Sequence, residues 1–322
     1  MATDAPLHPI PLAGSRRRPR LGDLALRGIT GLAAVVLAAL MVLLVYEVTR
    51  EAWASISAFR LGFVTATDWN AVTDTFGARD LILGTLVTSL GALVIAVPMS
   101  IAIGVFLSEL APRAIRTPVT MLVELLAAIP SVVLGLWGIL VMGPFVAQHL
   151  EPTLLRHFGW VPFISGYPSN QGLLPAILVL TIMVVPIVAS ISRELFLNVP
   201  SDLKQGSLAL GATRWEMVRS VMIPQVSGGL VAAVMLGFGR AVGEAIAVTQ
   251  VIGGANRLPG SLFGPADTMA SRIAAQYAGS ATTLQRSSLA YLAVLLLAIS
   301  LLTNLSAQLI AARIQRRMRG VA

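Results

Sequence analysis

Six long apolar stretches alternate with shorter polar connections along the chain. Each stretch contains few or no Asp, Glu, Lys or Arg residues, and each is long enough to cross the roughly 30 Å hydrocarbon layer of a membrane, for which about 20 helical residues suffice. The pattern therefore predicts an all-α, polytopic membrane protein with six transmembrane helices. The predicted spans cover about residues 28–48, 81–108, 117–143, 173–195, 225–251 and 287–312.

The last outer connection carries a second, shorter helical pattern. Met269, Ile273 and Tyr277 recur at four-residue spacing, which places them on one face of a helix. An apolar stripe of this kind more often packs against the protein than serves as a docking surface. We therefore expect a short outer helix that packs on the membrane domain.

The distribution of basic residues predicts the orientation of the spans. Six spans place both ends of the chain on one side, and with the N-terminus inside, the inner segments hold more than twice as many Lys and Arg residues as the outer ones. Both termini are thus predicted to be cytoplasmic, as basic tails at residues 1–27 and 313–322 around a transmembrane domain at 28–312. The first span lacks a small-x-small cleavage pattern, which favours an uncleaved signal-anchor helix. The C-terminal tail is expected to contact anionic membrane lipid.

Composition supports the membrane assignment and excludes several kinds of site. The chain has 322 residues, of which 56% are apolar and 12% charged, and its mean hydropathy is +0.82. In this context the net charge of +8 reports topology and does not indicate a nucleic-acid partner. Cysteine is absent, and the three histidines, His8, His149 and His157, lack the spacing of metal ligands. We therefore expect no disulfide, no metal site, no cofactor and no bound nucleic acid.

The polar segment between the fourth and fifth spans, residues 198–224, is the most informative connection. Gly211 can adopt the left-handed conformation that ends a helix. Thr213 and Glu216 match the capping box that begins the next helix. The segment, called the cytoplasmic knob below, is predicted to hold two short helices with Trp215 as an apolar anchor that a partner protein can grip.

Two charged residues occur deep within the fifth predicted span. Arg240 lies about fourteen residues, or roughly 20 Å, along the helix, and Glu244 follows one turn later on the same face. A charge at mid-helix costs at least about 2.5 to 3.5 kcal/mol. Two alternatives remain open from the residues alone. Either Arg240 and Glu244 neutralise each other and only hold the bundle together, or Arg240 offers its guanidinium fork to an oxyanion while Glu244 positions it.

Three polar residues follow this pair toward the outer mouth of the span. Thr249, Gln250 and Asn256 either hydrogen-bond a passing anion or satisfy irregular backbone. They are therefore possible, secondary pathway residues.

The knob resembles the cytoplasmic loop of ATP-binding-cassette importer permeases. In that loop Glu-Ala-Ala is followed after three residues by Gly and, nine residues later, by Ile-x-Leu-Pro. Here Gly211 and Pro224 match at this spacing, whereas Gln205, Gly206 and Ser207 replace Glu-Ala-Ala. Glycine in place of alanine at position 206 is expected to weaken the first short helix by roughly 1 kcal/mol.

Further segments resemble the PstC family of phosphate importer permeases. They are Glu124–Val133, Leu210–Glu216, Gly239–Glu244, Ala247–Gly253 and Asn256–Phe263. This resemblance, which extends over most of residues 81–280, implies the type I permease fold of these importers and a place in the cytoplasmic membrane of a bacterium. It also implies that Arg240 and Glu244 line the path of phosphate.

The resemblance implies several partners as well. The chain has no glycine-rich phosphate loop, and its single lysine, Lys204, is preceded by Leu203, so ATP hydrolysis must occur on another subunit. That subunit would be a PstB-like ATP-binding dimer, beside a homologous PstA-like second permease and a PstS-like external phosphate-binding protein. The residues expected to couple to the ATP-binding subunit are Gln205, Gly206, Ser207, Gly211, Thr213, Arg214, Trp215, Glu216 and Pro224.

The function expected from the sequence is thus a permease subunit of an ATP-driven inorganic phosphate importer. The nearest alternative keeps this architecture but carries molybdate, sulfate or phosphonate. A secondary transporter is disfavoured, since no second series of acidic or basic residues that could couple transport to protons faces inward. A membrane enzyme is disfavoured too, because no nucleophile, base and orienting group recur on one face.

Overall fold

The computed structural model describes residues 21–319 of the chain. Within this range, six helical segments are long and apolar enough to cross a membrane, which confirms the predicted number. The predicted N-terminal tail up to residue 20 lies outside the described residues. The six segments are Leu24–Phe59, Arg79–Leu110, Ser131–Phe158, Leu173–Leu197, Arg214–Gly243 and Thr283–Ile310.

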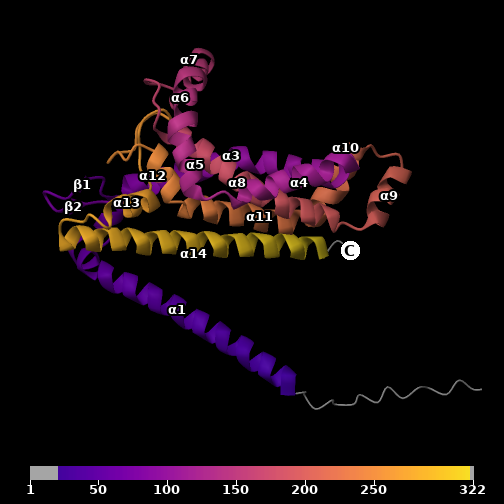
Figure 1. Cartoon of the computed structure of the whole chain (residues 1–322), viewed down its shortest axis with the longest axis horizontal. Coiled ribbons are helices and arrows are strands. Elements are labelled where there is room, and N and C mark those ends of the chain that lie inside the picture. Colours follow the sequence, from indigo (N-terminus) through magenta and orange to yellow (C-terminus); the bar gives the residue numbers. More distant parts are fainter. Residues whose placement is uncertain (1–20, 320–322) are drawn as a thin grey trace, which may run out of the picture. The chain divides into compact units, whose positions relative to one another are not determined.

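Helices make up nearly all of the regular structure (Figure 1). One antiparallel hairpin, β1 (Trp69–Asn70) with β2 (Thr75–Phe76), is present in the described part of the chain. In chain order the helices are α1 (Leu21–Phe59), α2 (Gly62–Thr65), α3 (Arg79–Val105), α4 (Arg113–Ala128), α5 (Ser131–Trp137), α6 (Gly143–Phe145), α7 (Glu151–Phe158), α8 (Leu173–Leu197), α9 (Ser201–Ala209), α10 (Arg214–Met217), α11 (Ile223–Gly243), α12 (Ile246–Val251), α13 (Met269–Gln276) and α14 (Thr283–Arg319).

The chain divides into two compact parts, of which the first ends at Glu47 and the second begins at Val48. In the first part, α1 exposes apolar side chains such as Leu32, Val36 and Leu40. A long helix that is apolar all round is typical of a membrane span.

The centre of the second part is α8, which packs against α3, α4 and α11. Val184 and Val188 of α8 are fully buried. A side chain at Gly237 of α11 would lie 2.8 Å from the Val188 side chain, so glycine is needed where these two helices approach. On the other side of α11 runs α14 (Figure 1). These helices together position the polar groups described below.

The third span begins later than predicted. Residues 113–128 form the separate helix α4, which has no buried residue, and the spanning segment starts at Ser131 instead of about residue 117. The chain is extended at Ile129 and Pro130, because the ring of a proline disfavours helical conformation in the residue before it. Glu124 consequently lies on the exposed helix α4.

The fifth span differs from its prediction at both ends. It starts at Arg214, since α10 continues through a π-helical turn, Val218–Met222, into α11. This wider turn precedes Pro224, whose ring and missing N–H would strain a regular helical turn. At the outer end α11 stops at Gly243, and the extended backbone at Glu244 separates it from α12.

The outer helix matches its prediction, whereas the last helix is longer than its predicted span. The helix predicted after Asp267 is confirmed as α13, and its Met269 is fully buried in a cluster that Ile273 and Tyr277 join. The last apolar span, Thr283–Ile310, ends close to its predicted end, but the helix α14 continues beyond it to Arg319 through the predicted C-terminal tail.

Candidate functional site

A cavity of about 480 Å³ surrounds the deep arginine predicted from the sequence. Three spans contribute to it, namely α8, α11 and α14. Its lining consists of Ile187, Met235, Leu236, Gly239, Arg240, Gly243, Glu244 and Asn304. The walls are largely apolar, so the polar contribution comes from one guanidinium, one carboxylate and one carboxamide.

Arg240 and Glu244 both line this cavity but do not form a direct ion pair. Within residues 21–319, the exposed Arg240 side chain makes no hydrogen bond or ion pair. Glu244 is 8% exposed, and its Oε1 accepts a hydrogen bond from the Ala247 amide at 3.3 Å. The break after Gly243 turns Glu244 out of the regular one-turn spacing that would have placed it beside Arg240.

This arrangement leaves the guanidinium free for a ligand. A charge in a membrane span is costly unless it has a partner or faces water. Arg240 meets that condition by facing the cavity, and its planar fork matches the two oxygens of an oxyanion. The buried carboxylate of Glu244 lines the same cavity and offsets the positive charge of Arg240. The positive and the negative charge balance each other when the cavity is empty. The guanidinium can still bind an anion that enters.

The three secondary pathway residues are engaged with the protein. The Thr249 hydroxyl donates to the Ala245 carbonyl at 2.6 Å. The Gln250 amide lies 3.5 Å from the Val132 carbonyl. Asn256 donates to the Trp69 carbonyl at 3.1 Å and accepts from Arg272 at 2.7 Å. None of the three lines the Arg240 cavity. Their geometry therefore favours the alternative that they hydrogen-bond irregular backbone and not a passing anion.

Asn256 belongs to a buried polar cluster on the outer side that the sequence did not reveal. Arg272 is 1% exposed, pairs with Asp267 at 2.6 Å and lies 5.6 Å from the Trp69 ring centre. The pKa of the Asp267 carboxyl is raised because burial disfavours its charge, an effect that Arg272 opposes. The cluster joins the hairpin to α13 and is structural.

The cytoplasmic knob has the predicted local structure. Gly211 adopts φ +88 between α9 and α10, and Thr213 with Glu216 forms both halves of the capping box. Trp215 is 67% exposed and Leu210 is 92% exposed. These two apolar side chains give the knob a surface that suits a partner groove. The other predicted coupling residues lie on the same two helices, except Pro224, which lies at the start of α11.

An ion pair that we did not predict fixes the knob to the membrane domain. Lys204 of α9 donates to Glu109 at 2.6 Å and to the Phe196 carbonyl at 3.0 Å. The two charged side chains are only 15% and 18% exposed. Such a pair holds α9 against the inner end of the α3 span. The only signal for this ion pair in the sequence is that Lys204 is the single lysine of the chain.

Replacing Lys204 with Met should loosen α9. The Glu109 carboxylate would remain largely buried without its cation, which costs about 1 to 3 kcal/mol. We expect faster hydrogen exchange of the α9 amides in the membrane-inserted protein, whereas Lys204→Arg, which keeps the charge, should preserve their protection. Equal exchange in the Lys204→Met variant and the unmodified protein would show that the ion pair does not hold the knob.

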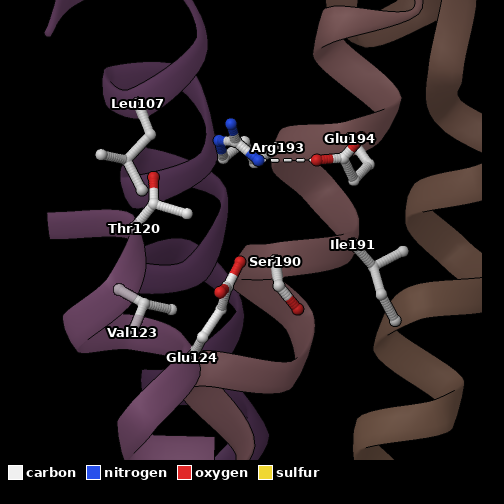
Figure 2. A pocket seen from close by; sticks show the side chains of 8 residues that line it. All are labelled: Leu107, Thr120, Val123, Glu124, Ser190, Ile191, Arg193 and Glu194. Carbon is white, nitrogen blue, oxygen red and sulfur yellow. Dashed lines mark hydrogen bonds and ion pairs between the residues drawn. The ribbon is translucent and has the colours of Figure 1, made fainter. Parts of the chain in front are cut away.

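A second, smaller hollow of about 160 Å³ lies near the inner end of α8. Figure 2 shows Glu124 of α4 beside Ser190 of α8, and Arg193 of α8, whose guanidinium donates to Glu194 at 2.6 Å. Two carboxylates outnumber the single guanidinium here, so the hollow carries net negative charge. This charge repels an anion, and the Arg240 cavity is the better candidate for an anion site.

No metal centre is indicated by the described residues. Between residues 21 and 319 no three His, Cys, Asp or Glu side chains are grouped so that they could hold an ion.

Comparison with known protein sequences identifies close relatives. A phosphate transport system permease protein PstC of Haemophilus influenzae is 42% identical over 291 residues, which cover 89% of this chain and 92% of the relative. The protein of the same name from Mesorhizobium japonicum is 39% identical over 94% of this chain and 93% of its own length.

Solved structures show the same fold. One chain of a bacterial alginate ABC transporter matches 91% of this chain and 99% of its own length, with a TM-score of 0.57 and 16% identity. A chain of the MetNI methionine ABC transporter matches 74% of this chain and 94% of its own, with a TM-score of 0.50 and 24% identity. The fold is thus that of type I ABC importer permeases.

The family model described as "binding-protein-dependent transport system inner membrane component" matches residues 100–320. This range includes four of the six spans in full, the inner end of the Arg79–Leu110 span, the whole knob and every residue that lines the Arg240 cavity. Together with the identities above, the match shows that the chain belongs to the family of binding-protein-dependent transport system inner membrane components.

Proposed function

We propose that the chain is the transmembrane permease subunit of an ATP-driven importer of inorganic phosphate. The relatives that match nearly its whole length are phosphate transport system permeases. The family and the six apolar helices indicate a multi-pass protein of the bacterial inner membrane. The chain itself performs no chemical reaction, and a separate subunit hydrolyses ATP.

The observation that carries this proposal is the unpaired Arg240 guanidinium in a cavity between membrane spans. A phosphate oxyanion crossing an apolar layer needs a counter-charge along its path, and arginine supplies that charge with bidentate hydrogen bonds. Glu244 limits the positive potential when no anion is present. These features support phosphate or a chemically similar oxyanion as the cargo.

The second half of the pathway is proposed to come from a PstA-like permease. Gly239 and Gly243 have open space where a Cβ atom would lie, and Arg240 between them is exposed in this chain. Small residues allow close approach of a second helix in a membrane. A homologous subunit that covers this face would close the cavity around the anion.

The knob is proposed as the contact with a PstB-like ATP-binding dimer. Its exposed Trp215 and Leu210 supply apolar anchors, and Lys204 ties it to the α3 span through Glu109. A movement of the ATP-binding dimer would thereby reach the α3 span, which packs against the cavity-lining helix α8. An external PstS-like binding protein would deliver phosphate to the outer loops.

Uptake measurements test the proposal and its nearest alternative. Cells that lack this chain, and the same cells supplied with it, are given labelled phosphate with sulfate or molybdate as competitors. We expect uptake to be restored only by the chain and to be inhibited only by unlabelled phosphate. Phosphate uptake that does not depend on the chain would disprove the assignment of the cargo, and competition by sulfate or molybdate would favour the alternative permease.

A further inference from the structure

One polar residue of the Arg240 cavity comes from the last span. Asn304 of α14 lines the cavity together with Arg240 and Glu244. It lies twenty-one residues into α14, counted from Thr283. The side chain therefore approaches the anion site from a different helix than Arg240 and Glu244 do.

The surroundings of Asn304 make its carboxamide unusual. The neighbours Leu301, Leu302 and Leu305 are apolar and exposed, as expected for a surface within a membrane. The Thr303 hydroxyl donates a hydrogen bond to the Ile299 carbonyl at 2.5 Å. Ser306 likewise donates to the carbonyl of Leu302 at 2.7 Å.

Asn304 has no such local partner. Within residues 21–319 its carboxamide makes no hydrogen bond to the protein. An unsatisfied amide in an apolar layer costs free energy, so its presence calls for a partner that arrives from elsewhere. The cavity that it lines is the place where such a partner can bind.

We propose that Asn304 is a third substrate-contacting residue, and that with Glu244 it selects a tetrahedral oxyanion that carries a hydroxyl group. This inference rests on the proposed phosphate function and specifies the chemistry of the same site. Arg240 can only donate hydrogen bonds, an ionised Glu244 can only accept them, and the Asn304 carboxamide can do both.

The hydrogen-bond donors and acceptors of the three groups match those of a protonated oxyanion. Ionised oxygens accept hydrogen bonds from the Arg240 guanidinium and the Asn304 amide. A hydroxyl on the anion donates to the Glu244 carboxylate or to the Asn304 carbonyl. Sulfate has no hydroxyl near neutral pH, so it would leave an acceptor unpaired and meet the carboxylate with repulsion. Phosphate and arsenate both keep a hydroxyl.

The first arm of the test measures phosphate uptake by the reconstituted full complex. Asn304→Leu should lower the uptake rate about tenfold, while Asn304→Ser, which keeps a donor and an acceptor, should recover part of it. Thr303→Val removes a polar group from the adjacent position outside the cavity and should leave the rate unchanged. Co-purification of the subunits and ATPase activity should be normal in all three variants.

The second arm uses the absence of cysteine from the chain. A single cysteine introduced as Asn304→Cys is exposed to a small hydrophilic thiol reagent, and its modification is measured by mass on this chain. Phosphate and arsenate should slow the modification several-fold, and sulfate and chloride should not. Thr303→Cys, which is outside the cavity, should show no anion-dependent protection.

The outcomes separate this inference from the proposed function. If Asn304→Leu transports normally in a complex that Arg240→Gln inactivates, or if it fails only because the second permease no longer co-purifies, Asn304 does not contact the substrate. Equal protection by sulfate would overturn the selectivity for a hydroxyl-bearing anion. If the unmodified complex does not transport phosphate, the proposed function itself is wrong.

Discussion

Replacing Arg240 with Gln should abolish phosphate uptake, with a fall of at least about 100-fold, while the complex still assembles. The substitution removes the counter-charge and up to two charge-assisted hydrogen bonds, each with a net contribution of about 1.5 to 3 kcal/mol. Because Arg240 makes no hydrogen bond or ion pair within residues 21–319, its removal should leave the described fold intact. The measurement is uptake of labelled phosphate by vesicles that contain the full complex.

Two further variants define what Arg240 contributes. Arg240→Lys retains the charge but not the planar fork, so we expect uptake between that of the unmodified protein and that of Arg240→Gln. Arg156→Gln removes an exposed arginine of α7 and serves as the matched control. Normal uptake in the Arg240→Gln vesicles would exclude Arg240 from the pathway and reopen the choice of anion.

Replacing Gly211 with Val should uncouple the knob from the ATP-binding subunit. The residue has φ +88, and no atom lies within 4 Å of the position that a Cβ would occupy. The effect is therefore one of backbone conformation alone, and a β-branched residue in the left-handed region costs about 1 to 2 kcal/mol. Relief of this strain would turn α9 relative to α10 and displace the exposed Trp215.

Co-purification of the ATP-binding subunit and uptake measure this effect. Both should fall several-fold with Gly211→Val, and both should largely recover with Gly211→Asn, since asparagine tolerates the left-handed conformation. Gly260→Val tests the same chemical change at an outer-loop glycine that has open space and no positive φ, and should have no effect. Unchanged co-purification with Gly211→Val would show that the ATP-binding subunit does not grip the knob.

Several features of this protein could be predicted because their causes are local. The length and apolarity of each stretch determine whether it can cross a membrane, so six spans follow from the order of residues. The turn at Gly211 and the capping box of Thr213 with Glu216 depend on neighbouring residues, and both are confirmed. The identity of Arg240 as a costly intramembrane charge is also a local property.

Boundaries of the spans were predicted less well. The prediction of a third span from about residue 117 treated α4 and the following helix as one segment, although Pro130 marks their separation. Apolarity alone does not distinguish an amphipathic helix such as α4 from the start of a span, because both contain many apolar residues. The break at Glu244 has no proline to signal it, and the helix α12 that follows it packs against α5.

The sequence by itself determined the class of the protein, the number of its spans and the residues that carry charge into the membrane. Only the tertiary structure decided which groups meet. It brought Asn304 to the Arg240 cavity, left Arg240 without an ion pair, and joined Lys204 to Glu109 across ninety-five residues. Hydrophobic length and backbone conformation are encoded by neighbouring residues, whereas contacts between distant side chains depend on the packing of whole helices, which no local pattern specifies.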